Sequence, residues 1–253
     1  MVDSLPCRLR ERIWLRTQAL LWPPTCVLCG AAGQSPVFDL CAPCEADLPI
    51  NSWACSMCAQ PLQGTGPKDV TTSLRCGACL RRPRRFDSAC CPFRYAYPLD
   101  HLVRALKYHG DVAHGRVLGE LLAYRIQQTR TGKLPDLLLP VPLASRRFRE
   151  RGYNQAIELA RCIERRLQIP MRTDLVTRIR ETREQAALRG RERRRNIRGA
   201  FEMTGQLPAS HVAIVDDVVT TGSTVNELAR ILKRAGVAKV EVWAVARTGG
   251  ASR

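Results

Sequence analysis

Apolar residues follow two different spacings from residue 86 to the end of the chain. Apolar positions three and four residues apart predict amphipathic helices at residues 99–108, 117–127, 153–167 and 224–235. Short apolar runs between them predict buried strands at residues 90–97, 137–141, 175–179, 213–215 and 240–246. Because strands and helices alternate, the pattern predicts an α/β fold with a mostly parallel sheet and helices on both faces.

The N-terminal third of the chain follows a different pattern. Residues 1–22 place leucine, isoleucine and tryptophan among arginines, and two prolines end the predicted amphipathic helix. Its apolar side is expected either to pack on the rest of the protein or to lie on a membrane surface. Residues 23–85 have too few long apolar runs to form a core without a metal. We therefore expect a helix at 1–22, a cysteine-rich domain at 23–85 and an α/β domain at 86–253.

Eight of the 12 cysteines lie in Cys-x-x-Cys pairs, which have the spacing of zinc ligands. Two thiolates from one tight turn reach the same tetrahedral ion, and a second pair completes its coordination. The candidate ligands are Cys26, Cys29, Cys41, Cys44, Cys55, Cys58, Cys76 and Cys79. One or two structural zinc ions are expected, and the spacing leaves both sequential and cross-braced pairing open. Disulfides, which are typical of secreted chains, are the competing interpretation.

The location of the protein follows from what the N-terminus contains. It lacks the continuous apolar core and the small-residue cleavage site of a secretory signal. No apolar run approaches the roughly 20 residues that span a bilayer. We therefore expect a cytoplasmic protein, and contact of the first helix with the inner face of the membrane stays open.

The most informative segment is residues 211–224, where an apolar strand leads into two acids and a turn rich in threonine, glycine and serine. A helix is predicted to follow the turn, so its first N–H groups and its dipole favour an anion such as a phosphate. The two carboxylates suit ribose hydroxyls or a magnesium ion, which prefers oxygen ligands. The candidate binding residues in this segment are Asp216, Asp217, Val218, Thr220, Thr221, Gly222, Ser223 and Thr224. An ordinary strand–turn–helix corner is the alternative interpretation.

Basic residues give the chain a formal net charge of +17. Residues 145–200 alone hold 17 arginines, no lysine and 7 acids. Such an excess favours polyanionic partners, namely nucleic acid, anionic lipid or phosphorylated substrates, because arginine pairs with phosphate through two hydrogen bonds. A solvated basic surface is the plainer alternative.

Two arginine-rich segments are candidates for contact with a phosphorylated ligand, and the first of them suits a diphosphate. The first, a predicted basic loop after the strand at 137–141, contains Arg146, Arg147 and Arg151. The second, expected to form a mobile flap that closes over a phosphorylated ligand, contains Gln185, Arg193 and Asn196. A surface charge run is the competing interpretation of the second segment.

These features together resemble one protein family. The segment at 211–224 is similar to the 5-phosphoribosyl 1-diphosphate (PRPP) motif of type I phosphoribosyltransferases. With the cysteine pairs and the Val-Pro-Leu and Arg-Gly-Tyr-Asn-Gln stretches within 141–155, it resembles the ComF/GntX family over about residues 21–247. The resemblance implies a double zinc ribbon joined to a type I phosphoribosyltransferase fold. It also implies PRPP bound with magnesium, with the acids on the ribose hydroxyls and the turn on the 5-phosphate.

Three functions are compatible with this resemblance. In the first, the chain acts as a cytoplasmic competence factor that binds PRPP and single-stranded DNA taken up from outside. Alternatively, it transfers the phosphoribosyl group to an unidentified nucleobase or amine. In the third, its zinc ribbons dock on a DNA-uptake channel or a helicase. No residue identifies an acceptor, so enzymatic activity stays open at this point.

Overall fold

The computed structural model of the chain describes residues 25–33, 39–63, 74–108, 112–180 and 197–249. The chain divides into two compact units, Met1–Leu48 and Pro49–Arg253. This division falls inside the predicted cysteine-rich domain, so two cysteine pairs belong to each unit. The predicted helix at 1–22 lies outside the described residues. Among the helices that are described, none has the length and apolar character to cross a membrane.

The described part of the first unit is a tight turn and a short helix. Thr25 and Ala32 form an antiparallel bridge around the turn, in which Gly30 has φ +75°. Cys41 immediately precedes helix α2 (Ala42–Ala46), which has a proline in its first turn. The turn and the helix start each carry two cysteines, as zinc knuckles do.

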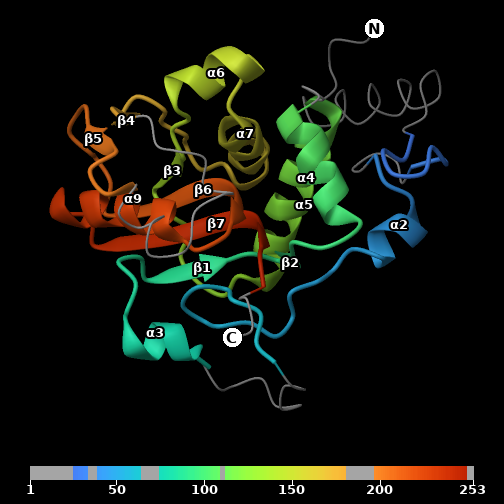
Figure 1. The fold of residues 1–253 in the computed structure, drawn as a ribbon, viewed down its shortest axis with the longest axis horizontal. Coiled ribbons are helices and arrows are strands. Elements are labelled where there is room, and N and C mark those ends of the chain that lie inside the picture. Colours follow the sequence, from blue (N-terminus) through green and yellow to red (C-terminus); the bar gives the residue numbers. More distant parts are fainter. Residues whose placement is uncertain (1–24, 34–38, 64–73, 109–111, 181–196, 250–253) are drawn as a thin grey trace, which may run out of the picture. The chain divides into compact units, whose positions relative to one another are not determined.

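A five-stranded parallel sheet forms the centre of the second unit (Figure 1). Its strands are β1 (Ser88–Cys90), β2 (Phe93–Arg94), β3 (Leu137–Pro140), β6 (His211–Val219) and β7 (Lys239–Arg247). They are ordered β1-β7-β6-β3, and β2 pairs with β7 further along the same edge as β1. Apolar runs form the central strands because both faces of a parallel sheet are buried. The α/β fold expected from the sequence is confirmed.

Helices and one small sheet complete the second unit. The helices are α3 (Gly77–Arg81), α4 (Leu99–Tyr108), α5 (Val112–Thr129), α6 (Ser145–Arg151), α7 (Gln155–Leu167) and α9 (Ser223–Arg234). Strands β4 (Val176–Arg178) and β5 (Phe201–Met203) form a separate antiparallel pair. Local chemistry sets the ends of α7, because the Asn154 side chain caps its first turn and Gln168 ends it in a left-handed conformation.

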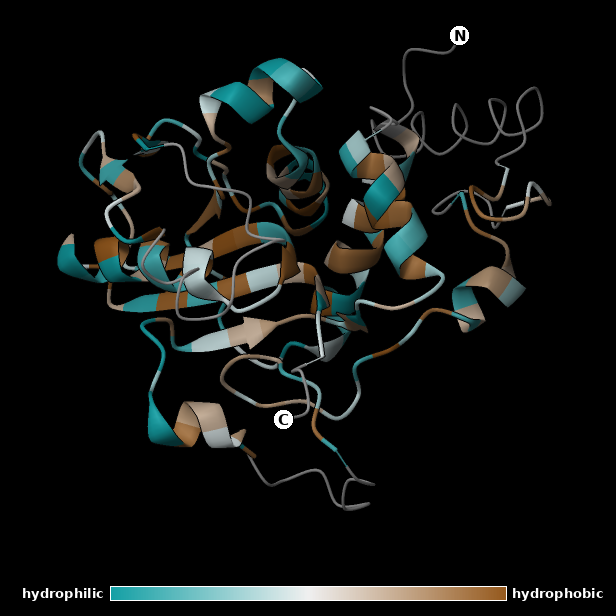
Figure 2. Cartoon of the chain, in the orientation of Figure 1, coloured by the Kyte–Doolittle hydropathy of each residue, from teal (hydrophilic) through white to brown (hydrophobic). Residues whose placement is uncertain are grey.

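The core has one layer on each face of the sheet. Leu139 and Ile214 lie in a buried cluster with Leu228 of α9. Alternate strand residues such as Leu138 and Trp243 are equally buried and point to the other face, because successive side chains of a strand alternate. There α5 and α7 pack on each other and contact β7, β6 and β3. Figure 2 shows the central strands as largely hydrophobic and α6, which has no buried residue, as mostly hydrophilic.

The structure differs from the sequence pattern in several places. Asp216 and Asp217 lie within β6 and not in the turn, because β6 stays paired with β7 as far as Val219. The expected basic loop is the helix α6, which Gly152 ends with φ +78°. The expected strand at 90–97 is shorter in the structure: β1 overlaps it only at Cys90, and β2 covers only Phe93 and Arg94. Strand β5 has no counterpart among the predicted strands.

Candidate functional site

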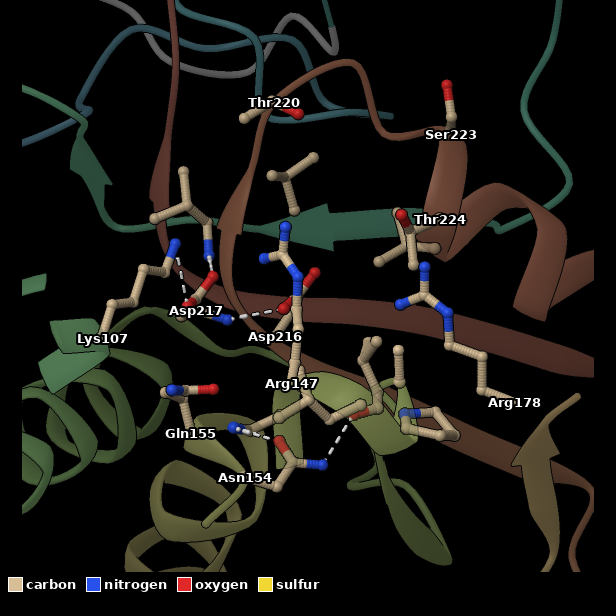
Figure 3. A pocket seen from close by; sticks show the side chains of 18 of the residues that line it. Lys107, Arg147, Asn154, Gln155, Arg178, Asp216, Asp217, Thr220, Ser223 and Thr224 are labelled. Atoms are coloured by element: carbon tan, nitrogen blue, oxygen red, sulfur yellow. Dashed lines mark hydrogen bonds and ion pairs between the residues drawn. The ribbon is translucent and has the colours of Figure 1, made fainter. Parts of the chain in front are cut away.

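A cavity of about 340 Å³ opens at the carboxyl ends of β3 and β6. Its walls include residues 141–144 after β3, residues 154–156 at the start of α7, and residues 216–220 and 222–225 around the start of α9. Ligands of open α/β sheets bind at this end, where the helices that follow the strands begin. The cavity is therefore the candidate functional site of the second unit (Figure 3).

Two adjacent carboxylates, those of Asp216 and Asp217, lie in the cavity wall. Asp216 Oδ1 accepts a hydrogen bond from the Asp217 amide at 2.9 Å, and Asp217 Oδ1 accepts one from the Val218 amide at 2.6 Å. Burial, together with the neighbouring charge of Asp217, raises the pKa of Asp216 to about 7. The pair therefore favours a ligand that brings hydroxyl donors or positive charge.

Lys107, in the last turn of α4, supplies a counter-charge to this pair. Its Nζ lies 3.0 Å from Asp217 Oδ2, and Figure 3 shows the side chain reaching toward the acids. Although burial disfavours the charged form, the ion pair with Asp217 raises the pKa of Lys107 above its ordinary value. The sequence offered only a weak signal for this residue, which is one of five lysines beside 35 arginines.

The turn between β6 and α9 shapes a site for an anion. Gly222 precedes α9 with φ +72°, a left-handed conformation that favours glycine. The Ser223 amide donates to Thr221 Oγ1 at 3.3 Å, and the hydroxyl oxygens of these two residues are 2.8 Å apart. Thr220, Ser223 and Thr224 line the cavity, whereas Thr221 is not among the lining residues. The start of α9 and the hydroxyls around it therefore favour an anionic group in the cavity.

Arginines from two elements bring positive charge to the cavity. Arg147 and Arg151 come from α6, and Arg178 comes from the end of β4. Figure 3 shows the guanidinium groups of Arg147 and Arg178 pointing into the space beside the acids and the turn. Arg146, a candidate from the sequence, is not among the lining residues, and its Nε pairs with Glu150 Oε1 at 2.8 Å.

The start of α7 contributes two amide side chains. Asn154 Oδ1 accepts from the Ala156 amide at 3.0 Å, while Asn154 Nδ2 donates to the carbonyl oxygen of Val141 at 3.0 Å. This side chain therefore ties the loop after β3 to α7. Gln155 is 3% exposed, lines the cavity, and has no partner for its Nε2 among the described residues. Because buried amides are normally paired, Gln155 is a candidate donor to a ligand oxygen.

Several lining residues carried no functional signal in the sequence. Tyr95 and Tyr108 line the cavity, and the Arg151 guanidinium lies 5.7 Å from the centre of the Tyr108 ring. Tyr95 lies in a predicted strand and Tyr108 ends a predicted helix, where periodicity indicates packing and not chemistry. The flap candidates Gln185, Arg193 and Asn196 lie outside the described residues.

The eight paired cysteines form two sequential clusters, Cys26, Cys29, Cys41 and Cys44 in the first unit and Cys55, Cys58, Cys76 and Cys79 in the second. Within each cluster the sulfur atoms lie within 4.8 Å of one another. The Sγ atoms of Cys29 and Cys41 are 3.6 Å apart, and those of Cys58 and Cys76 are 3.7 Å apart. Tetrahedral zinc with bonds of about 2.3 Å separates its sulfur ligands by about 3.8 Å. Both clusters therefore fit structural zinc ribbons.

Comparison with known families matches both parts of the chain. The family described as "Double zinc ribbon domain" matches residues 17–80. The family described as "Phosphoribosyl transferase domain" matches residues 153–252, which include the start of α7, the acids and the turn. These matches agree with the two four-cysteine clusters and with the parallel sheet.

Individual relatives extend over most of the chain. "Competence protein F" of Haemophilus influenzae is 32% identical over 228 residues, which cover 88% of this chain and 96% of that protein. "DNA utilization protein YhgH" of Escherichia coli strain K12 is 36% identical over 223 residues, which cover 84% of this chain and 98% of that protein. "Competence protein ComFC" of Bacillus subtilis is 31% identical over 212 residues, or 80% of this chain and 81% of that protein.

Proposed function

Because the chain belongs to the ComF family, we propose that it is a ComF-like cytoplasmic protein that binds PRPP and acts in natural competence. Its role there is the uptake and use of external single-stranded DNA. The names of the relatives support the process, and the match to the phosphoribosyl transferase family supports the ligand class. Two thiolate zinc sites support a cytoplasmic location, because such sites suit a reducing compartment.

One observation carries the proposed ligand. The acid pair at the end of β6 leads directly into a glycine-capped helix start, and both line one cavity. In the proposed complex the turn and the first amides of α9 hold the 5-phosphate. Asp216 and Asp217 accept hydrogen bonds from the ribose hydroxyls, and Arg147 and Arg151 pair with the diphosphate.

A magnesium ion fits the same proposal. The carboxylate of Asp216 lines the cavity and is a hard oxygen donor of the kind that magnesium prefers, whereas the ammonium group of Lys107 pairs with Asp217. Bound magnesium would neutralise charge on the diphosphate. Lys107 keeps one carboxylate of the pair compensated in the ligand-free protein.

Calorimetric titration of PRPP with magnesium into the zinc-loaded protein tests the proposed site. We expect saturable binding by the wild type and at least about tenfold weaker binding by the double variant Asp216→Asn/Asp217→Asn. Asp174→Asn is the matched control, because Asp174 is exposed and lies outside the cavity lining. Equal affinity of the double variant and the wild type would refute the site.

A transferase activity is the second candidate, favoured by the aromatic side chains of the cavity. Tyr95 and Tyr108 line the same space as the proposed diphosphate site, so they offer ring faces for a planar acceptor. Release of diphosphate from PRPP, measured against a panel of nucleobases and amines, tests this activity. If no acceptor raises the release of diphosphate above the blank, the transferase activity is refuted and PRPP binding is the function that remains.

The net charge of +17 supports single-stranded DNA as a partner. Phosphate neutralisation makes such binding weaken steeply with salt, so the affinity for an oligonucleotide is measured across a salt series. A flat salt dependence would contradict the proposal. Docking on a DNA-uptake channel or helicase, and contact of residues 1–22 with a membrane, stay predictions.

A further inference from the structure

The second four-cysteine cluster is built into the unit that contains the cavity. Its members are Cys55, Cys58, Cys76 and Cys79. Three of them are buried in the same core layer as α9 and the central strands. Two arginine side chains connect this part of the chain to the turn between β6 and α9.

Arg247, the last residue of β7, makes the first connection. It is 3% exposed. Its Nε donates to the carbonyl oxygen of Cys58 at 3.0 Å. Its Nη1 donates to the carbonyl oxygen of Val219 at 2.8 Å and also to that of Thr220. One rigid guanidinium therefore contacts the backbone of the cluster on one side and the backbone of the turn on the other.

Arg84, which follows α3, makes the second connection. Its Nη1 donates to the carbonyl oxygen of Thr221 at 3.3 Å, and its side chain lies close enough to Cys79 to interact with that thiol. The next residue, Arg85, donates its backbone amide to Asn226 Oδ1 in α9 at 2.8 Å. The chain segment that leaves the cluster therefore contacts both the turn and the helix that follows it.

These contacts fix the direction of the peptide groups in the turn. The carbonyl groups of Val219, Thr220 and Thr221 all point to arginine side chains. In a trans peptide, a carbonyl group and the N–H group of the following residue point in opposite directions. The amides of residues 220–222 are therefore turned away from the two arginines. Thr220 and Gly222 line the cavity, where an anion would meet such N–H groups.

We infer that the second four-cysteine cluster positions the phosphate-binding turn through Arg84 and Arg247, so that zinc at this cluster and a phosphate in the cavity stabilise each other. Both arginines are positioning residues, because they contact the turn's carbonyl groups. The identity of the ligand rests on the proposed function, whereas the connection between cluster and turn does not. Linkage is reciprocal, so zinc strengthens phosphate binding by the factor by which phosphate strengthens zinc binding.

Hydrogen exchange of the backbone amides at 216–226 tests this connection in the full-length, zinc-loaded protein without ligand. Arg84→Ala removes one contact, and Arg82→Ala changes an exposed arginine nearby as its matched control. Cys76→Ser weakens the second cluster, and Cys44→Ser is the matched change in the first. We expect exchange about tenfold faster for R84A and C76S, the size expected for one charge-assisted hydrogen bond. In both controls, R82A and C44S, the turn amides should exchange at the wild-type rate. The amides of β3 serve as a separate reporter, because faster exchange there indicates global unfolding.

Binding provides the second readout. PRPP with magnesium should bind about tenfold more weakly to R84A and C76S than to the wild type. The variant C44S lacks one ligand of the first cluster and keeps the second cluster intact. In this variant, PRPP with magnesium should slow the loss of zinc from the second cluster to a chelator.

The outcomes separate the two claims. Unchanged exchange of the turn in both R84A and C76S, or equal acceleration in R82A or C44S, would overturn the inference. If C76S unfolds globally, the exchange rate of the turn amides in R84A alone tests the inference. A wild type that binds no PRPP would overturn the proposed function, and the exchange experiment would still test the connection.

Discussion

The ion pair between Lys107 and Asp217 leads to a quantitative prediction. The Nζ and Oδ2 atoms are 3.0 Å apart, which at an effective dielectric constant of about 20 corresponds to an attraction of about 5.5 kcal/mol. Removing the lysine from water costs part of this energy. Water also weakens the attraction, because 24% of the Lys107 side chain and 13% of the Asp217 side chain are exposed. We therefore predict a net coupling energy of about 2 kcal/mol between the two side chains.

A double-mutant cycle measures this coupling. It compares the wild type, Lys107→Met, Asp217→Asn and the double variant by urea denaturation, with the buried Trp243 as a fluorescent reporter of the sheet. Lys133→Met is the matched control, because Lys133 lies 3.8 Å from Asp136 and its side chain is 85% exposed, so we expect no measurable change. A coupling energy below about 0.5 kcal/mol would refute the role of Lys107 as the counter-charge of the acid pair.

Three further predictions concern the turn, the far end of the sheet and the arginines of α6. Gly222→Ala should lower the free energy of unfolding by about 1 kcal/mol, because an alanine at φ +72° is strained, and should weaken PRPP binding in calorimetry. Although burial acts to raise it, the ion pair with Arg130 helps to lower the pKa of Glu241 to about 2. Because the pKa is lower in the folded protein, the ionised carboxylate stabilises the fold at pH values above its ordinary pKa of 4.5. Glu241→Gln should therefore lower the free energy of unfolding by on the order of 2 kcal/mol at pH 7. In urea denaturation this difference should vanish as the pH falls from 4.5 to 2. Arg147→Ala should weaken the binding of PRPP with magnesium about tenfold in calorimetry, whereas Arg146→Ala, outside the cavity lining, should leave it unchanged.

Local pattern was sufficient for much of the fold. The helix predicted at 99–108 has the bounds of α4, because its apolar positions form one stripe that meets the core. The strand–turn–helix segment was predictable because glycine at 222 and the hydroxyl residues around it have few other reasons to occur together. The cysteine pairs predicted metal clusters for the same reason, since their spacing serves one tetrahedral ion.

Other features depend on contacts between distant segments. The acids at 216 and 217 lie in a strand despite their low strand propensity, because pairing with β7 outweighs it. Lys107 reaches the acid pair from a helix more than a hundred residues earlier in the chain, and no local spacing reports such a contact. Arg247 ends an apolar strand and looks like a surface residue in the sequence, although it is buried against the second cluster.

We propose that the cavity binds PRPP through the acid pair and the turn. A crystal structure of the zinc-loaded protein grown with PRPP and magnesium tests this binding mode. We predict the 5-phosphate within hydrogen-bonding distance of the amides at 222–224 and the ribose hydroxyls beside Asp216 and Asp217. This binding mode would be contradicted if PRPP bound on the basic surface outside the cavity. It would also be contradicted if no phosphate lay at the turn when the ligand is saturating.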